Sequence, residues 1–315
     1  MTGNQSTHTN REIAIIQGDA QDNLLFGGRH DDFLDGGPGT DTADYLGKPT
    51  DFTIIFDSRQ LIQITDRKDW IPFLGIGNFD EGTDQLLDIE LVQFGDGRVV
   101  ALDLFDGGTT LSEAEFRSFT EMYIAYFNRA PDSEGLLFWA DAFARGTSMP
   151  EIAEYFALSP EAQAAFPAGS SNANFISTVY DNVLGRQPDA AGEAFWNQVL
   201  DNGAVSRSQF VLEILKGARA APGANADPAF VVQQQADQKF LDDKVDIGLH
   251  FSAWLGMSNV ANATDVMNLF DGSDASKLAA RDASLDDYSR ASEYDMQAEL
   301  LFQLRGVFDD PFAVA

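Results

Sequence analysis

Three consecutive nine-residue units, each opening on glycine, occupy residues 18–44: GDAQDNLLF, GGRHDDFLD and GGPGTDTAD. The third unit matches G-G-x-G-x-D in full. The second has His30 at the place of its third glycine, and the first has Asn23 at the place of its aspartate. This periodicity predicts a parallel β-roll, in which each unit makes a six-residue turn and then a three-residue strand. Two units complete one coil, so each turn should stack on the turn eighteen residues away.

The same pattern predicts which side chains point into the roll and which atoms line its turns. Leu25, Leu34 and Ala43 are the apolar strand residues expected to face inward. Glycine lets a turn place its carbonyl oxygens on the concave side, and the aspartate at the sixth position adds a carboxylate. Ca²⁺ binds six to eight such oxygens. The turns therefore predict a calcium site.

One complete site should lie between the first and third turns, with Asn23 and Asp41 as side-chain ligands. The second turn, with Asp32, has no regular fourth unit to face, because residues 45–53 break the pattern. The predicted metal ligands are oxygen atoms of the turn residues Gly18, Ala20, Asn23, Gly27, Arg29, Asp32, Gly36, Gly37, Gly39 and Asp41.

These repeats resemble those of the RTX family of secreted calcium-binding proteins, and the resemblance extends over about residues 13–104. DFTIIFD and QLIQITD alternate like two paired strands, and residues 82–102 look like the segment that closes such a roll. Gly82, Thr83 and Asp84 echo half a unit, which suggests a further ion there. The resemblance implies secretion or cell-surface display through a type I channel that reads an uncleaved C-terminal signal. The tail FDDPFAVA is compatible with such a signal, which would explain a missing N-terminal one.

Composition restricts the partners of the chain. Fifty Asp and Glu against 20 Lys and Arg give a formal charge of −30, and there is no cysteine. A phosphate backbone or an anionic membrane surface would be repelled, disulfides and thiolate metal sites are impossible, and no apolar run is long enough to span a bilayer. We therefore expect no nucleic-acid partner and no membrane insertion.

The second half contains a duplication at an offset of 57 residues: YFNRAPDSEGLLFW (126–139) returns as VLGRQPDAAGEAFW (183–196). The unit predicts a helix, an R-x-P-D turn, a second helix, a glycine turn and a third helix. Its paired residues are Arg129 and Arg186, Asp132 and Asp189, Gly135 and Gly192, Phe138 and Phe195, Trp139 and Trp196, and Gly146 and Gly203.

Most of this motif has a structural explanation. The aspartates should cap the second helix of each unit, the glycines should allow close helix packing, and the Phe–Trp pairs should fill the core. Arg129 and Arg186 could bind an anion at the helix start. More often, such an arginine satisfies carbonyls at the preceding helix end or pairs with a neighbouring carboxylate. The duplication resembles an uncharacterised all-helical domain of bacterial secreted and RTX-containing proteins, and more distantly the helical linker domain of phycobilisomes. The resemblance covers about residues 112–285 and implies no catalytic role.

The sequence predicts a multidomain α+β chain: a short N-terminal parallel β-roll with a β-strand cap, followed by a larger all-α domain. The expected segments are a disordered tail (1–12), the roll with its closing strands (13–104), a linker (105–112), the duplicated helical domain (113–285), and a C-terminal helix with a possible secretion signal (286–315).

No enzyme motif is present: HExxH, the phosphate-binding GxxxxGK[ST] loop, GxSxG and GxGxxG opening a helix are all missing. His8 lies in the polar tail, His30 in a turn, and His250 in an apolar stretch where a core role is expected. We therefore predict a non-enzymatic protein of structural or adhesive role, a subunit of an extracellular or cell-surface assembly whose folding is coupled to Ca²⁺.

Three alternatives remain open from the sequence alone. In a carbohydrate-binding module, exposed Trp70 and Tyr45 would grip a polysaccharide. A secreted hydrolase would use an unrecognised site. Self-association through the helical domain would give a homopolymer.

Overall fold

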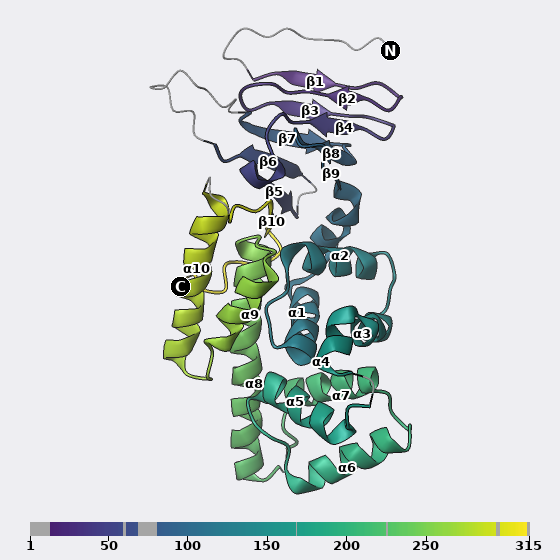
Figure 1. Cartoon of the computed structure of the whole chain (residues 1–315), viewed down its shortest axis with the longest axis vertical. Coiled ribbons are helices and arrows are strands. Elements are labelled where there is room, and N and C mark those ends of the chain that lie inside the picture. Colours follow the sequence, from purple (N-terminus) through teal and green to yellow (C-terminus); the bar gives the residue numbers. More distant parts are fainter. Residues whose placement is uncertain are drawn as a thin grey trace.

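The computed structural model describes residues 13–58, 61–68, 81–167, 169–224, 226–293 and 297–313. The N-terminal part of the chain forms strands, and these lie at one end of a larger helical part (Figure 1). The predicted α+β fold, with a strand region followed by a larger helical region, is therefore confirmed.

The first four strands form the coils of a parallel roll. Strand β1 pairs with β3 and β2 pairs with β4, each in parallel, and both registers join residues eighteen positions apart, as in Ile15↔Phe33. Leu34 and Ala43 are completely buried, and Leu25 is nearly so. The predicted stacking period and inward residues are thus confirmed. The strands are β1 (Ile15–Gln17), β2 (Leu24–Leu25), β3 (Phe33–Asp35) and β4 (Thr42–Asp44).

Five further strands continue the two sheets toward the helices. One sheet has the order β1-β3-β7-β6-β5 and ends on a C-terminal strand, β10 (Leu301–Arg305), and the other has the order β2-β4-β8-β9. The alternating segments predicted to pair are β5 and β6, and they are antiparallel. Strands β7 and β8 add in parallel to β3 and β4. The bounds are β5 (Phe52–Asp57), β6 (Ile62–Asp66), β7 (Thr83–Leu87), β8 (Leu91–Gln93) and β9 (Val99–Ala101).

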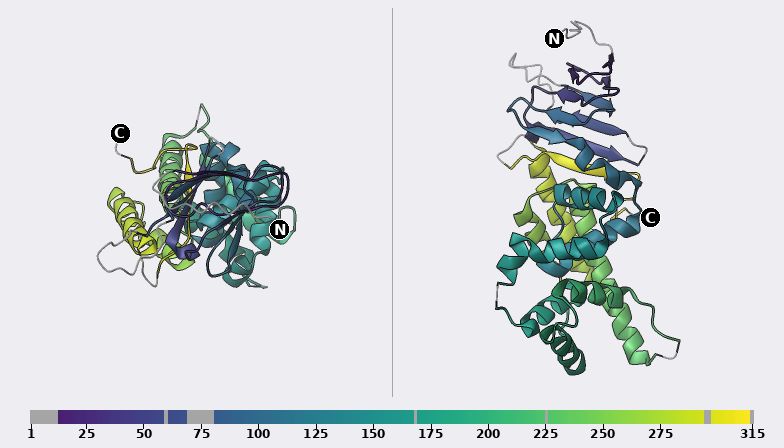
Figure 2. Two further views of the ribbon diagram at one scale, coloured as in Figure 1. Left: turned by 90° about the horizontal axis from the view of Figure 1, so that it is seen from above. Right: turned by 90° about the vertical axis from the view of Figure 1, so that its right-hand side faces the viewer.

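The C-terminal segment differs from the helix expected at 286–315. Helix α10 (Asp274–Ser292) ends early, and strand β10 (Leu301–Arg305) returns to the roll and pairs in parallel with β5. Figure 2 shows β10 as the last rung of the sheet, directly above the helices. Leu301 and Phe302 are completely buried, so burial against both parts favours a strand here.

The expected linker at 105–112 is also structured. Short 3₁₀ helices at Leu102–Leu104 and Asp106–Thr110 pack against helix α2 (Ser133–Ala144). The backbone N–H of Gly107 donates to Asp141 Oδ1 at 3.2 Å, and Gly108 is buried. The two parts of the molecule are therefore joined by packed chain rather than by a free linker.

The helical part repeats at the predicted offset. Helices α2 and α6 begin and end 57 residues apart, and Asp132 and Asp189 cap them by accepting the N–H groups of Gly135 and Gly192. The helices of the repeat are α1 (Glu113–Phe127), α2 (Ser133–Ala144), α3 (Met149–Leu158), α4 (Pro160–Ala165), α5 (Asn172–Leu184), α6 (Ala190–Asp201) and α7 (Arg207–Arg219).

Both arginines of the repeat pair with carboxylates. Arg129 binds Glu161 through two hydrogen bonds of 2.8 and 2.9 Å, and Arg186 binds Asp237 at 2.9 and 2.7 Å. These are the bidentate pairs that a guanidinium forms best. The expected pairing of each arginine with a carboxylate is thus confirmed.

The expectation for the Phe–Trp pairs is wrong for the phenylalanines. Trp139 and Trp196 pack against the core, but Phe138 and Phe195 keep 44% and 55% of their surface exposed. The helix turns each phenylalanine about 100° away from its tryptophan. Gly135 fits the close-packing prediction, since a methyl group there would lie 2.4 Å from the Tyr123 hydroxyl oxygen.

A long helix, α8 (Pro228–Leu249), holds the two repeats together through Lys244. The ammonium donates to the Asn182 carbonyl at 2.8 Å and to Asn128 Oδ1, both near helix C-termini, where a positive charge is favoured. Lys244 is nonetheless almost completely buried, and this burial lowers its pKa to about 8. Helix α8 continues into a π-helix (His250–Trp254), followed by α9 (Val260–Asn268) and α10.

Lys244 makes stability depend on pH in the alkaline range. The native chain loses this proton near pH 8, but the unfolded chain keeps it up to its ordinary pKa of about 10.4. The unfolded state thus binds more protons in this window, so stability should rise with pH, by about 1 kcal/mol between pH 8 and pH 9. Urea unfolding at both pH values measures this, and Lys244→Met should remove the rise. An equal rise in the variant would contradict the assignment.

Candidate calcium site

The turns of the roll depend on backbone conformations that favour glycine. Gly28 has φ of +101° and Gly37 has +77°, in the left-handed region that side chains disfavour. His30, at the position of a missing glycine, also has positive φ, +95°. The second turn therefore keeps the backbone path of the repeat despite its altered sequence.

Carboxylates at the sixth position of the turns join successive coils. Asp41 Oδ1 accepts the N–H of Asn23 at 2.7 Å, and Asp32 Oδ1 accepts the N–H of Ala14 at the same distance, both across eighteen residues. The first turn therefore faces the third, as predicted. The two aspartates thus bridge neighbouring coils in the same way.

Glycines mark the points where oxygens converge. A methyl group on Gly18 would lie 2.2 Å from Asn23 Oδ1 and 2.3 Å from the Gly36 carbonyl oxygen. A methyl group on Gly39 would lie 2.8 Å from the Gln21 carbonyl oxygen and 3.3 Å from Asp41 Oδ2. Any side chain at these positions would collide with the oxygens, so glycine is needed for the chain to approach them this closely. Oxygens gathered in this way are the ligands that a hard cation prefers.

The half unit at 82–84 takes the place opposite the second turn, where the sequence offers no regular unit. The N–H of Asp32 donates to Asp84 Oδ1 at 2.8 Å, and a methyl group on Gly27 would lie 3.0 Å from Oδ2 of both aspartates. Burial raises the pKa of Asp84 to about 7. Tyr45 donates to Asp84 Oδ2 at 2.8 Å and is itself buried.

Buried Tyr45 is thus not an exposed residue that could grip a polysaccharide, because its ring packs inside the roll on Phe52 and Phe94. Trp70, its expected companion, and His8 lie outside the described residues.

One carboxylate oxygen of the third turn is buried without a hydrogen-bond partner among the described residues. Asp41 is completely buried, and its Oδ2 has no hydrogen-bond partner within the part of the chain that the structure describes. Leaving a buried carboxylate oxygen unpaired is unfavourable. Such an atom fits a ligand of a bound cation.

The other predicted ligands have no side-chain oxygen that could bind calcium. Ala20 and Arg29 occupy the third position of the first and second turns and are exposed, so they could contribute only their carbonyl oxygens. Gly37 approaches the first turn, since a methyl group there would lie 3.4 Å from the Asp19 carbonyl oxygen. Among the described residues, no three His, Asp or Glu side chains gather as a metal site. A calcium ion here would therefore need backbone carbonyls, as the repeats predict.

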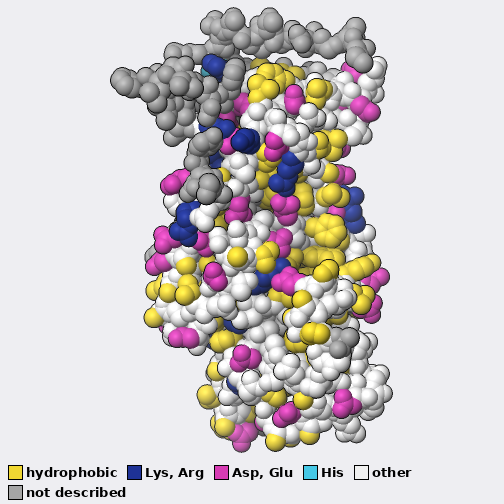
Figure 3. Space-filling model, in the orientation of Figure 1, with side chains coloured by type: hydrophobic (Ala, Val, Ile, Leu, Met, Phe, Trp, Pro, Cys, Tyr) yellow, Lys and Arg dark blue, Asp and Glu magenta, His cyan; other side chains and the backbone are white. Residues whose placement is uncertain are grey.

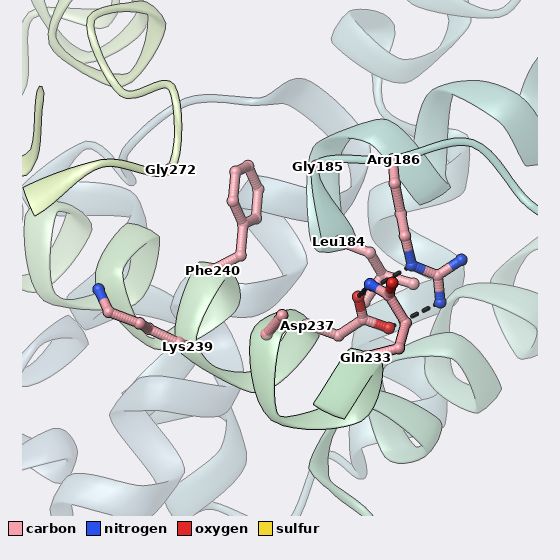
Figure 4. Close-up of a pocket in the computed structure, with 9 residues that line it drawn as sticks. Leu184, Gly185, Arg186, Gln233, Asp237, Lys239, Phe240 and Gly272 are labelled. Atoms are coloured by element: carbon pink, nitrogen blue, oxygen red, sulfur yellow. Dashed lines mark hydrogen bonds and ion pairs between the residues drawn. The ribbon is translucent and has the colours of Figure 1, made fainter. Parts of the chain in front are cut away.

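A cavity of about 270 Å³ lies in the helical part, beside Arg186 (Figure 4). Its charged groups already bind one another: Asp237 accepts from Arg186 and from Gln233 Nε2, and Lys239 pairs with Asp243. Phe240 covers Gly185. The cavity is thus a gap between paired residues rather than an organised site.

His250 has the core role expected from the sequence. It is buried, its Nδ1 lies 2.9 Å from Asp310 Oδ1, and burial lowers its pKa. Its ring packs edge-on against Phe312. The histidine therefore fixes the C-terminal segment to the π-helix.

Two family models match this chain. Residues 13–43 match the RTX calcium-binding nonapeptide repeat, and residues 107–166 and 153–220 match a domain of unknown function, DUF4214. No curated protein and no solved structure matches the chain. The chain therefore contains RTX repeats at its N-terminal end and, in its helical part, two copies of DUF4214.

The match to RTX repeats bears on the predicted cofactor. RTX repeats bind Ca²⁺ and are typical of secreted proteins, so the calcium cofactor is confirmed. Neither family is catalytic in general, and neither is a nucleic-acid-binding family. No helix in the described residues is long and apolar enough to cross a membrane.

Proposed function

We propose that this chain is a secreted, non-enzymatic structural or adhesive protein, a subunit of an extracellular or cell-surface assembly, whose β-roll folds with bound Ca²⁺. The ligands in this proposal are the turn oxygens around Gly18, Gly27, Gly36 and Gly39, with Asp32 and Asp41 as the charged members. Bound calcium would supply positive charge beside the carboxylates of these turns. Export through a type I channel is part of the proposal.

The unpaired Oδ2 of Asp41 is the observation that carries the proposal. The side chain is completely buried, and the other oxygen is used by Asn23. Residues 13–43 are also the part that matches the RTX model. A buried carboxylate is stable only when its charge is compensated, and Ca²⁺ would do this.

Net charge supports coupling between calcium and folding. The carboxylates, which give the chain its charge of −30, are spread over both parts of the visible face (Figure 3). Where calcium is scarce, the acidic turns repel one another and remain loose. Where calcium is abundant, binding free energy becomes folding free energy, because the ion binds only the assembled turns.

Exposed aromatic side chains in the helical repeats support the assembly role. Phe138 and Phe195 occupy the same position in the two copies, and both are exposed. Tyr155, which is 57% exposed, stacks on Trp139 with a centroid distance of 5.8 Å. Figure 3 shows apolar side chains gathered on the visible face near the level of α2. Exposed apolar surface of this kind favours contact with another protein.

Calorimetric titration tests the metal site. Wild-type protein should bind Ca²⁺ in the millimolar range or tighter, and Asp41→Ala should weaken binding at least about tenfold, because it removes a charged ligand. Asp35→Ala is the matched control, since Asp35 lies at the end of the preceding strand β3 and its carboxylate accepts from Gln17 Nε2 in an exposed hydrogen bond. Absence of calcium binding by the wild type would refute the proposal.

A further inference from the structure

The segment Leu87–Glu90 stacks on the third turn in the same way as the third turn stacks on the first. The N–H of Gly36 donates to the Leu87 carbonyl at 3.0 Å, and the N–H groups of Glu90 and Leu91 donate to the Asp41 carbonyl at 3.2 and 3.0 Å. The strand registers continue this stacking, with Asp35 opposite Leu87 and Thr42 opposite Leu91. Residues 88–90 thus form a shortened turn outside the matched repeats. It faces the third turn and is called the fourth turn below, as distinct from the half unit at 82–84 that faces the second turn.

This stacking repeats the oxygen arrangement found at Gly18. A methyl group on Gly36 would lie 2.1 Å from the Asp88 carbonyl oxygen and 2.7 Å from Asp41 Oδ2. At Gly18 the corresponding atoms are the Gly36 carbonyl oxygen and Asn23 Oδ1. In both places a side-chain oxygen from the sixth position meets a carbonyl oxygen from the next coil.

The two arrangements differ in charge. Asn23 is neutral, and its Oδ1 already accepts the N–H of Asp19 at 2.7 Å. Asp41 brings a carboxylate whose Oδ2 has no partner among the described residues. Glu90 lies beside it, with Oε2 accepting the N–H of Asp41 at 2.7 Å. Asp41 stands beside Asn23 in the same way, since its Oδ1 accepts the Asn23 N–H. The second arrangement therefore has two carboxylates where the first has one carboxylate and one amide, so it should attract a divalent cation more strongly.

We infer that the third turn and the shortened fourth turn form a calcium site with Asp41 Oδ2 and the Asp88 carbonyl oxygen as ligands. Glu90 adds the second negative charge. The inference rests on the proposed calcium binding but moves the charged site away from the interface of the first and third turns. It also extends the role of calcium beyond the repeats, to the turn that leads into β8 and toward the helical part.

Calcium titrations of three variants test the placement. Glu90→Gln keeps an oxygen that can accept the Asp41 N–H but removes the charge, and it should weaken calcium binding about three- to tenfold. Asn23→Ala should change the affinity less than twofold. Asp96→Asn, in the exposed turn between β8 and β9, is the control and should leave the affinity unchanged. Circular dichroism verifies that each variant is folded.

Hydrogen exchange of the full chain gives an independent measurement. Added calcium should slow exchange at the amides of Glu90 and Leu91 together with that of Asp41. If calcium binds but Asn23→Ala weakens it as much as Asp41→Ala, while Glu90→Gln and the amides at 90–91 are unaffected, the ion lies between the first and third turns. That result overturns this inference and leaves the proposed function intact. A wild type that takes up no calcium refutes both.

Discussion

Phe302→Ala should lower the free energy of unfolding by about 4 kcal/mol, the usual cost of replacing a completely buried phenylalanine by alanine. Phe302 lies in β10, opposite Ile54 of β5, and its ring packs on Phe105 at a centroid distance of 5.3 Å. Its backbone also contacts the helical part, because its carbonyl accepts from Ser133 Oγ and its N–H donates to the Gly256 carbonyl. The substitution thus leaves a cavity where sheet and helices meet.

Urea unfolding of the full chain measures this effect, and Phe230→Ala is the matched control. Phe230 lies on α8 with 56% of its surface exposed, so its removal should change stability by less than about 1 kcal/mol. Similar losses in both variants would mean that β10 is not part of the stable core.

The roll could be predicted from sequence because a period of nine residues leaves few choices. Two units per coil determine the register at eighteen residues, and the register determines that Leu34 and Ala43 face inward. The N-caps of α2 and α6 were equally predictable, because a short acidic side chain before a helix bonds to free N–H groups.

The fourth turn could not be predicted, because it breaks that period. Asp84 and Glu90 are the register equivalents of Asp32 and Asp41, but they are separated by six residues instead of nine. Asp88 makes the shorter turn possible with φ of +48°, a conformation that aspartate tolerates better than most residues. The sequence DQLLDIEL contains the carboxylates but no glycine pattern to show their stacking.

Contacts between distant segments account for the other differences. Strand β10 is short and irregular in sequence, and it becomes a strand because β5 and the helices meet around it. The carbohydrate-binding alternative needs an exposed Tyr45, but its hydroxyl donates to Asp84, 39 residues later, inside the roll. In the helical repeats, sequence periodicity identified Phe138 and Phe195 as apolar but could not show that about half of each side chain stays exposed among the described residues.

Removal of calcium should destabilise the chain by about 2.7 kcal/mol for each ion that binds at a hundred times its dissociation constant. The physical reason is that the unfolded chain cannot hold the turn oxygens together, so the ion stabilises only the native roll. The melting temperature should therefore be several degrees higher in 10 mM CaCl₂ than in EGTA, if the affinity is that of extracellular calcium modules, about 10⁻⁴ M.

Magnesium at the same concentration separates ion binding from screening of the charge. Mg²⁺ demands octahedral geometry at shorter distances and keeps its water ligands, so it should give only the smaller increase due to screening. Asp41→Ala should lose most of the calcium increment but keep the magnesium one, because only the first depends on the buried carboxylate. Equal effects of the two ions in wild type and variant would show that calcium acts on the net charge and not at the turns.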